Sequence, residues 1–425
     1  MRRITLKKSL LHTPEGVRDI YNAECSKKKV IVDRMRRVIE LYGYNGIETP
    51  TFEFFDIFDS EKGSVETKEL FKFFDRDGNI LVLRPDMTPS IARCAVKYYT
   101  EEDMPLRLSY VGNTFINNLN YQGRLKETTQ IGAELIGDDS VAADAEIIAI
   151  VINIMLKSGI SEFQVDIGQV DYFKGLIAEA ELDSTTAENL RKLIQEKNYF
   201  GVEELLDSSN CNDSVKNVFL RLPQLFGSYE ILDEARALAG NEISRNAVER
   251  LIELSRCLDE YGLLKYISFD FGMLSRYEYY TGIIFNAYTY GTGDSIIKGG
   301  RYDKLLAQFG TDVASVGFAV TVDQMLVAMS RQKINIDTDD NIKAIVYSKK
   351  YEKTAIKLAT NMRNNGQKVR FMQLDAKRDL TYYIKYCKNC KIAELIEVKS
   401  DNQVNITDIN TANAILKNID ELEGK

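Results

Sequence analysis

The sequence predicts an α+β fold in which flanking helices cover an antiparallel sheet, with a helical insertion and a small C-terminal α/β domain. Alternating apolar residues on both sides of a polar loop predict a long β-hairpin at residues 107–137. Residues 182–261 have the charged, amphipathic pattern of helices and no strand signal. From residue 342 the pattern alternates strand, helix, strand and helix. We therefore expect a core at residues 1–330, a polar linker at 331–341 and a C-terminal domain at 342–425.

The length and the charge of the chain narrow the possible classes of protein. With 425 residues the chain exceeds a single hydrophobic core, which favours two or three domains. A content of 44% apolar and 28% charged residues is typical of globular proteins. The formal net charge of −8 argues against nucleic acid as the main ligand. We therefore expect no nucleic-acid partner.

Several features favour a cytoplasmic protein. The sequence has no run of about 18 apolar residues, so no membrane span is expected. The basic segment at residues 1–10 is not followed by the apolar stretch of a signal peptide. The six cysteines are scattered, as is usual in a reducing compartment. Only Cys387 and Cys390 form a CxxC pair, and the single histidine, His12, lies far from it in the sequence. Neither a metal site nor a histidine-activated nucleophile is expected.

Hydrophobic periodicity and turn signals predict the remaining elements. Gly43 ends an N-terminal helix, and Asp77-Gly78 between two apolar runs predicts a hairpin. Four glycines between Tyr288 and Gly300 predict a loop that can close over a ligand. In the core we expect helices at 22–41, from about 90 and at 141–157, strands at 46–50, 70–75, 80–83, 162–167 and 267–270, and a strand that runs into a helix at 316–324. In the C-terminal domain we expect strands at 342–347 and 369–374 and helices at 353–365 and 379–386.

Two polar residues of the hairpin are candidates for a binding site. Gln130 and Glu134 lie four residues apart on one predicted strand, so both side chains point to the same face. An amide and a carboxylate on one face can bind an ammonium or an imidazole group. Asp86 and Thr88 precede the helix expected from about residue 90, and their side chains can cap it.

The hairpin resembles a known motif. Gly123-Arg124, the run from Gln130 to Glu134, and Gly137 are similar to motif 2 of class II aminoacyl-tRNA synthetases, and most similar to histidyl-tRNA synthetase. Residues 46–50 with the preceding helix resemble motif 1, the dimer interface, and residues 316–324 resemble motif 3. The resemblance implies a class II synthetase-like antiparallel sheet and a homodimer within any larger assembly. More faintly, the C-terminal domain resembles the anticodon-binding domain of these synthetases.

The same resemblance implies a site for histidine. In the synthetase, the acid and the threonine at the positions of Asp86 and Thr88 bind the α-amino group of the substrate. A pair of tyrosines closes over the imidazole, and here that pair is Tyr279 and Tyr280. The expected histidine-binding residues are therefore Asp86, Thr88, Gln130, Glu134, Tyr279 and Tyr280.

Three arginines of the synthetase are replaced in this sequence. In the synthetase they bind the α-phosphate of ATP, act on the carboxylate and the phosphate, and stack on adenine; their positions hold Ile116, Ser275 and Gln324. A site that forms an adenylate needs fixed cations where negative charge develops. We therefore expect no catalytic residues and no cofactor in this chain.

A synthetase-like body that keeps the amino-acid contacts and loses the nucleotide contacts resembles the regulatory subunits of ATP phosphoribosyltransferase. The resemblance implies a hetero-oligomer with a short-form catalytic subunit, which makes phosphoribosyl-ATP in the first step of histidine biosynthesis. It also implies allosteric feedback inhibition by histidine. Two alternatives remain: an active histidyl-tRNA synthetase, and a synthetase-like scaffold that binds RNA or protein.

Overall fold

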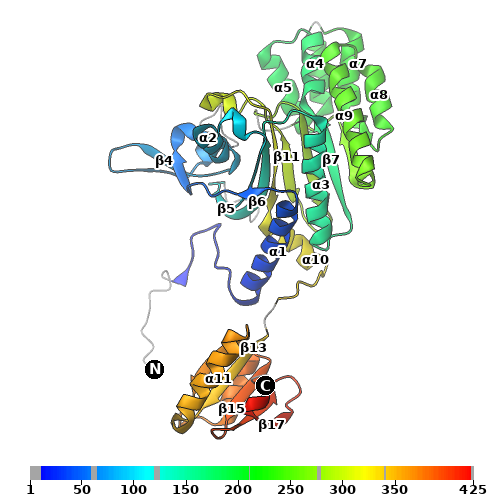
Figure 1. Ribbon diagram of the computed structural model, residues 1–425. Helices are drawn as coiled ribbons and strands as arrows, with labels where there is room; N and C mark the ends of the chain where they lie inside the picture. Colours follow the sequence, from blue (N-terminus) through cyan, green and yellow to red (C-terminus); the bar gives the residue numbers. More distant parts are fainter. Residues whose placement is uncertain are drawn as a thin grey trace. The chain divides into compact units, whose positions relative to one another are not determined.

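The structure is a computed structural model that describes residues 11–58, 65–118, 125–209, 211–274, 279–338 and 341–422. The chain forms two compact units, Met1–Ile336 and Asp337–Lys425, and Figure 1 labels their elements. Each unit has its own sheet and its own hydrophobic core. Among the described strands, none of one unit pairs with a strand of the other.

A nine-stranded sheet organises the first unit, in the order β1-β5-β6-β12-β11-β10-β7-β9-β8. Neighbouring strands are antiparallel, except that β1 with β5 and β7 with β9 are parallel. The predicted hairpin is formed by β5 and β6, which share ten paired positions. The strands are β1 (Asn45–Gly46), β5 (Leu106–Phe115), β6 (Glu127–Ile136), β12 (Ser315–Thr321), β11 (Ile297–Arg301), β10 (Ile283–Thr289), β7 (Phe163–Gln169), β9 (Ile267–Asp270) and β8 (Phe226–Gly227).

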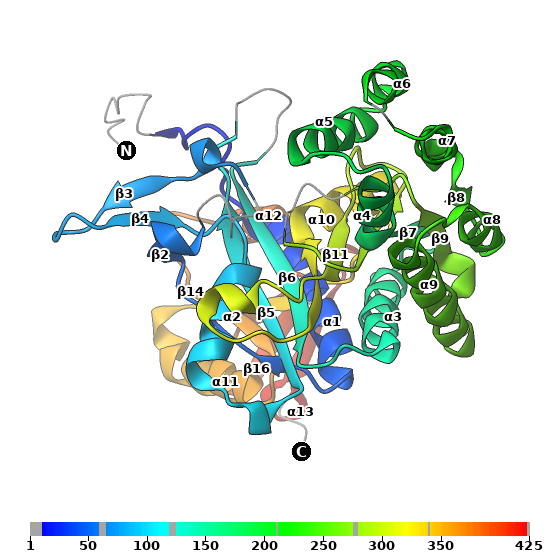
Figure 2. The same ribbon diagram turned by 90° about the horizontal axis from the view of Figure 1, so that it is seen from above.

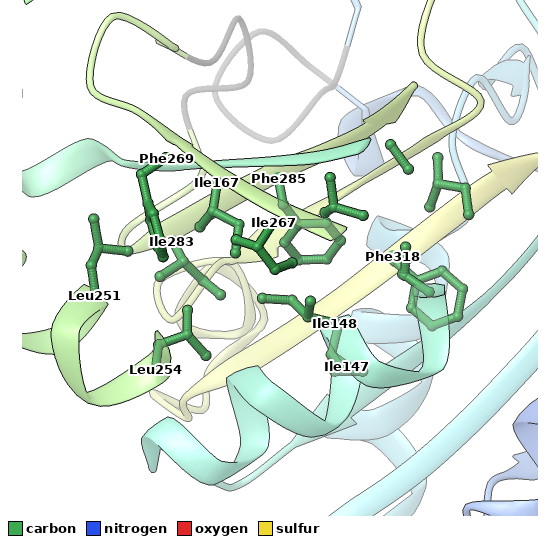
Figure 3. Packing of buried hydrophobic residues seen from close by; sticks show 14 of the residues in the cluster. Ile147, Ile148, Ile167, Leu251, Leu254, Ile267, Phe269, Ile283, Phe285 and Phe318 are labelled. Atoms are coloured by element: carbon green, nitrogen blue, oxygen red, sulfur yellow. The ribbon is translucent and has the colours of Figure 1, made fainter. Parts of the chain in front are cut away.

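Long helices cover one face of this sheet. They are α1 (Asn22–Leu41), α3 (Val141–Lys157), α9 (Glu242–Glu260) and α10 (Val322–Arg331). Figure 3 shows Ile148 of α3 beside Phe285 of the sheet and Leu254 of α9 beside Ile283. Each fully buried side chain of this size contributes about 1.5–3 kcal/mol. Although α3 is largely apolar, no helix in the described part of the chain combines the length and apolarity needed to cross a bilayer.

A group of helices is inserted between β7 and β9. They are α4 (Val170–Glu179), α5 (Ser184–Gln195), α6 (Tyr199–Ser208), α7 (Asp213–Arg221), α8 (Ile231–Leu238) and α9. Several begin at an asparagine or aspartate whose side chain accepts a backbone N–H of the first turn, such as Asp183 before α5 and Asn241 before α9. The expectation of a wholly helical segment was wrong at β8, because this part of the chain runs beside the sheet edge and pairs with β9.

Helix α2 (Thr88–Tyr98) and residues 302–313 cover part of the opposite face. Figure 2 shows α2 on one side of β5 and β6, with α1 and α3 on the other. A small sheet precedes α2 in the chain and has the order β2-β4-β3. Its strands are β2 (Phe52–Phe54), β4 (Ile80–Leu83) and β3 (Lys72–Phe74).

The prediction of a strand at residues 46–50 was wrong. The structure ends β1 at Gly46 and begins β2 at Phe52. Between them, the carbonyl oxygens of Thr49 and Pro50 accept hydrogen bonds from the Arg84 guanidinium at 2.8 and 3.3 Å. Pro50 also has no N–H to give to a neighbouring strand. A buried side chain therefore takes the place of a strand partner at this bend.

The second unit contains the elements expected for it and more. They are β13 (Ile342–Tyr347), α11 (Glu352–Asn364), β14 (Lys368–Gln373), α12 (Leu380–Asn389), β15 (Glu394–Val398), β16 (Gln403–Asp408), β17 (Ala414–Asn418) and α13 (Ile419–Leu422). The sequence did not predict the last three strands. All five residues of β17 are exposed, so this strand has no apolar alternation to detect.

Candidate functional site

A cavity of about 80 Å³ lies on the face of the main sheet that α2 partly covers. This is several times the roughly 10–15 Å³ that one water molecule needs. All six residues expected to bind histidine line the cavity: Asp86, Thr88, Gln130, Glu134, Tyr279 and Tyr280. The structure thus brings together three separate segments of the chain around a space suited to a small polar ligand.

Strand alternation explains which side chains face the cavity. On β6, Gln130 and Glu134 point into it, whereas Ile131, Ala133 and Leu135 point into the core under α1 and α3. The neighbouring strand β12 contributes small residues to the same face, because Gly317 pairs with Glu134 and Ala319 pairs with Gly132. The cavity therefore has a floor of backbone and small side chains, to which Gly317 and Ala319 contribute.

Glu134 is the most buried acid of the site, with 1% of its surface exposed. Its Oε1 accepts a hydrogen bond from the Thr88 hydroxyl at 2.9 Å, and its Oε2 accepts one from the Tyr302 hydroxyl at 2.5 Å. Burial raises the pKa of Glu134 to about 8, although these two hydrogen bonds oppose the shift. Near neutral pH this carboxyl group is therefore mostly neutral in the absence of a ligand. A cationic ligand group beside it would favour the charged form.

The second acid, Asp86, has two functions in the structure. Its Oδ1 accepts the backbone N–H of Met87 at 2.7 Å and that of Thr88 at 3.4 Å, at the start of α2. Its Oδ2 accepts a hydrogen bond from the Tyr279 hydroxyl at 3.3 Å. The N-cap of α2 is Met87 and not Asp86 or Thr88, so Asp86 holds the turn that leads into the helix and also lines the cavity.

Two tyrosines form one wall of the cavity. The ring centroids of Tyr279 and Tyr280 lie 4.9 Å apart, and Tyr279 meets Tyr302 edge to face at 6.1 Å. The Tyr280 ring lies over Gly300, where an added Cβ would come within 2.7 Å of a ring carbon. Glycine at position 300 thus lets an aromatic ring lie against the strand.

Three positions were expected to have lost synthetase arginines, and only one of them is described at the cavity. Ile116 lines the cavity, so an apolar side chain stands beside the predicted ligand. Gln324 lies in the first turn of α10 and is not among the described residues that line the cavity. Ser275, the neighbouring Arg276, and the Gly123-Arg124 pair lie outside the described residues.

Tyr302 and Lys298 are among the cavity residues that sequence reasoning missed. Lys298, Gly300 and Tyr302 are two residues apart along β11 and its continuation, so all three lie on the same face of the sheet. That alternation was visible in the sequence, but its significance depends on β11 lying next to β12. The closing loop expected between Tyr288 and Gly300 was also wrong in part, because Gly300 is inside β11 and packs in the sheet.

A buried ion network lies on the face of β11 that points away from the cavity. Arg301, next to Tyr302, donates to Oδ1 of Asp144 on α3 at 2.7 and 2.9 Å. Arg250 of the helical insertion donates to the other oxygen, Oδ2, at 2.5 and 2.9 Å. Asp303 also accepts from Arg301, at 3.2 Å. The Asp144 carboxylate thus joins the helical insertion to β11, the strand that leads into Tyr302.

Known proteins with this fold and sequence pattern fall into two related groups. Residues 16–325 match the histidyl-tRNA synthetase family. The ATP phosphoribosyltransferase regulatory subunit of Acetivibrio thermocellus is 41% identical over 356 residues, which cover 84% of this chain and 85% of that protein. The regulatory subunit of Ruminiclostridium cellulolyticum is 37% identical over 399 residues, covering 94% and 95%.

Solved structures agree with these sequence relatives. A Bacillus halodurans structure, described as an ATP phosphoribosyltransferase regulatory subunit/histidyl-tRNA synthetase, has a TM-score of 0.82 at 34% identity, covering 91% of this chain and 98% of that one. Histidyl-tRNA synthetase from a Nostoc species shares the fold, with a TM-score of 0.79 at 18% identity over 97% of this chain and 98% of that one. The chain therefore belongs to the family of ATP phosphoribosyltransferase regulatory subunits, which has the fold of histidyl-tRNA synthetase.

Proposed function

We propose that this chain is a non-catalytic subunit that makes a short-form ATP phosphoribosyltransferase catalytic subunit active, and that it binds histidine so that the end product can inhibit the first step of the pathway. Family membership supports the regulatory role. The single observation that supports histidine as the ligand is the convergence of Asp86, Thr88, Gln130 and Glu134 on one cavity.

The polar groups of the cavity fit the two basic groups of histidine. Oε1 of Gln130 is buried and has no hydrogen-bond partner among the described residues, so an N–H donor from a ligand would satisfy it. Glu134 and Asp86 supply carboxylates for an ammonium group and an imidazole N–H. The tyrosine pair supplies a flat apolar surface for the ring.

The same cavity is poorly suited to forming an adenylate. Its lining, among the described residues, has one cationic side chain, Lys298, which is 45% exposed and lies 3.5 Å from Asp294. Developing phosphate charge needs rigid cations or donors placed in advance. Ile116 at the arginine position supplies neither. An active histidyl-tRNA synthetase is therefore not favoured, and a scaffold without a ligand would leave the buried acceptor of Gln130 unexplained.

Co-expression with a short-form catalytic subunit tests the proposal. The catalytic subunit alone should be inactive or nearly so in forming phosphoribosyl-ATP from ATP and phosphoribosyl pyrophosphate. The co-purified complex should be active, and millimolar histidine should inhibit it. A catalytic subunit that is fully active alone, and that neither binds this chain nor changes with it, would contradict the proposal.

A further inference from the structure

Lys298 is placed on the cavity face of β11 by strand alternation. It faces the same side as Gly300 and Tyr302, and it pairs with Ala319 of β12. The next residue in that row is Gly132 of β6, which pairs with Ala319 on its other side. The methyl group of Ala319 leaves space beside Lys298, whereas the ring end of Tyr110 lies over Gly132, where an added Cβ would come within 2.4 Å of the Tyr110 hydroxyl oxygen.

The width of this floor matches an amino acid. Neighbouring strands lie about 4.8 Å apart, so Lys298 stands about 10 Å across the sheet from the strand that carries Gln130 and Glu134. The acidic groups of the cavity are on the β6 and α2 side, and the cation is on the β11 side. A zwitterion that gave its ammonium and imidazole groups to the acidic side would direct its carboxylate toward Lys298.

The present partner of Lys298 can be exchanged for a ligand at low cost. Nζ of Lys298 lies 3.5 Å from Asp294, and the two side chains are 45% and 52% exposed. Ion pairs this exposed contribute little to stability, because water and salt screen them. A ligand carboxylate within the cavity would compete with Asp294 for the ammonium group.

We propose that Lys298 binds the α-carboxylate of the amino acid in this cavity and thereby makes the site select an amino acid over its decarboxylated amine. The inference rests on the histidine-binding function proposed above. The acidic residues of the cavity offer no partner to the α-carboxylate of histidine, and Lys298 on β11 would supply one.

Calorimetric titration of the full chain with histidine and with histamine tests the assignment, because histamine lacks only the carboxylate. A charge-assisted hydrogen bond is worth roughly a 10–100-fold change in affinity, so the parent chain should bind histidine that much more tightly than histamine. In Lys298→Met this preference should fall to within about threefold, since only histidine loses a contact; histamine affinity should stay unchanged. Lys298→Arg should keep most of the preference.

Two control variants isolate the role of the lysine. Lys304→Met removes a lysine that is paired with Asp312 at 2.9 Å and is 68% exposed, and that is not among the described residues lining the cavity. This variant should keep the parent's preference for histidine. Asp294→Asn removes the competing carboxylate. This variant should bind histamine like the parent and should bind histidine at least as tightly as the parent.

The outcomes separate this inference from the function on which it rests. If neither ligand binds the parent chain, alone or with its catalytic subunit, the histidine-binding function fails and the inference fails with it. If both bind and Lys298→Met keeps the full preference for histidine, the function stands and the assignment of Lys298 is overturned. A third outcome is that the parent chain does not prefer histidine over histamine, and that inorganic phosphate competes with the ligand in the parent but not in Lys298→Met. That result would assign Lys298 to a phosphate group and would also overturn the inference.

Discussion

Glu134 and Gly317 are direct partners in the pairing of β6 with β12, and Oε2 of Glu134 occupies the space that a side chain on Gly317 would need. We predict that Gly317→Ala displaces the Glu134 carboxylate and weakens histidine binding by at least tenfold. It should also destabilise the fold by about 1–3 kcal/mol, the usual cost of forcing an extra methyl group into a packed site. Calorimetry and chemical denaturation measure the two effects.

The matched control for that substitution is Gly293→Ala. An added Cβ at Gly293 would meet no atom within 4 Å, and its backbone needs no left-handed conformation. This variant should bind histidine like the parent. Equal loss of binding in both variants would mean that the space shared by Glu134 and Gly317 has no part in the site.

The raised pKa of Glu134 predicts a pH dependence of stability in the absence of ligand. In the unfolded chain this carboxyl group loses its proton near pH 4.5, whereas in the folded chain it keeps it until about pH 8. Between these values the folded state binds more protons, so the contribution of Glu134 to the free energy of unfolding falls as pH rises from about 5 to 8. Glu134→Gln should remove this component from a pH series of thermal melts. Identical slopes in the parent and the variant would argue against a neutral buried acid.

The ion network predicts that the loss of Asp144 costs much more stability than the loss of Glu249, an acid in an exposed ion pair. Asp144→Ala leaves the guanidinium of Arg301, which is 4% exposed, without its main partner, and loss of one member of a buried pair costs about 3–5 kcal/mol. Glu249→Ala breaks the exposed pair of Glu249 with Arg236 and should cost about 0–1 kcal/mol. Urea denaturation followed by circular dichroism measures both. Equal costs would show that the buried network does not hold the insertion to the sheet.

If the synthetase arginines are lost, as the resemblance implies, the purified chain should form no histidyl-adenylate. One missing charge contact of this type lowers a rate by about 10²–10³. Restoring only the residue that lines the cavity, with Ile116→Arg, should therefore leave histidine-dependent pyrophosphate exchange at background. Exchange above background in the parent chain would contradict the non-catalytic assignment, and the histidyl-tRNA synthetase alternative would return.

The proposed feedback by histidine predicts a specific effect of a substitution at Tyr279. Its hydroxyl contacts Asp86 and its ring faces Tyr280, so Tyr279→Ala removes a wall of the cavity without touching the buried core under α3. The assembled complex should remain active but should need at least tenfold more histidine for inhibition. A reciprocal coupling of about 1–3 kcal/mol also requires the catalytic subunit to change histidine affinity. Unchanged inhibition of an assembled Tyr279→Ala complex would place the inhibitory site at the subunit junction or on the catalytic subunit.

The sequence was sufficient to place Gln130 and Glu134 on one face, because the geometry of a strand is local. It was also sufficient for the hairpin that carries them, since long alternating runs flank a polar loop. Family resemblance then added Asp86, Thr88 and the tyrosines, and all six residues do line one cavity.

The residues that were missed depend on contacts between distant strands. Tyr302 reaches Glu134 only because β12 separates β11 from β6 with a glycine at the crossing point. Nothing local in the sequence specifies that order of strands. Likewise, the partner of Arg301 is Asp144, on a helix formed much earlier in the chain. Strand periodicity gives the direction of a side chain, whereas sheet order and register decide what it meets.

The volume that Glu134 shares with the missing side chain of Gly317 makes these positions a complementary pair. A shorter acid at 134 would open a gap about as large as the methyl group that alanine at 317 would introduce. Glu134→Asp and Gly317→Ala should therefore each be harmful alone and compensate in part when combined. Such a double variant would keep a carboxylate but withdraw it from the cavity, and so should accept a longer basic group than imidazole. If histidine regulates the complex as proposed, the double variant would let an added synthetic ligand replace histidine as the inhibitor.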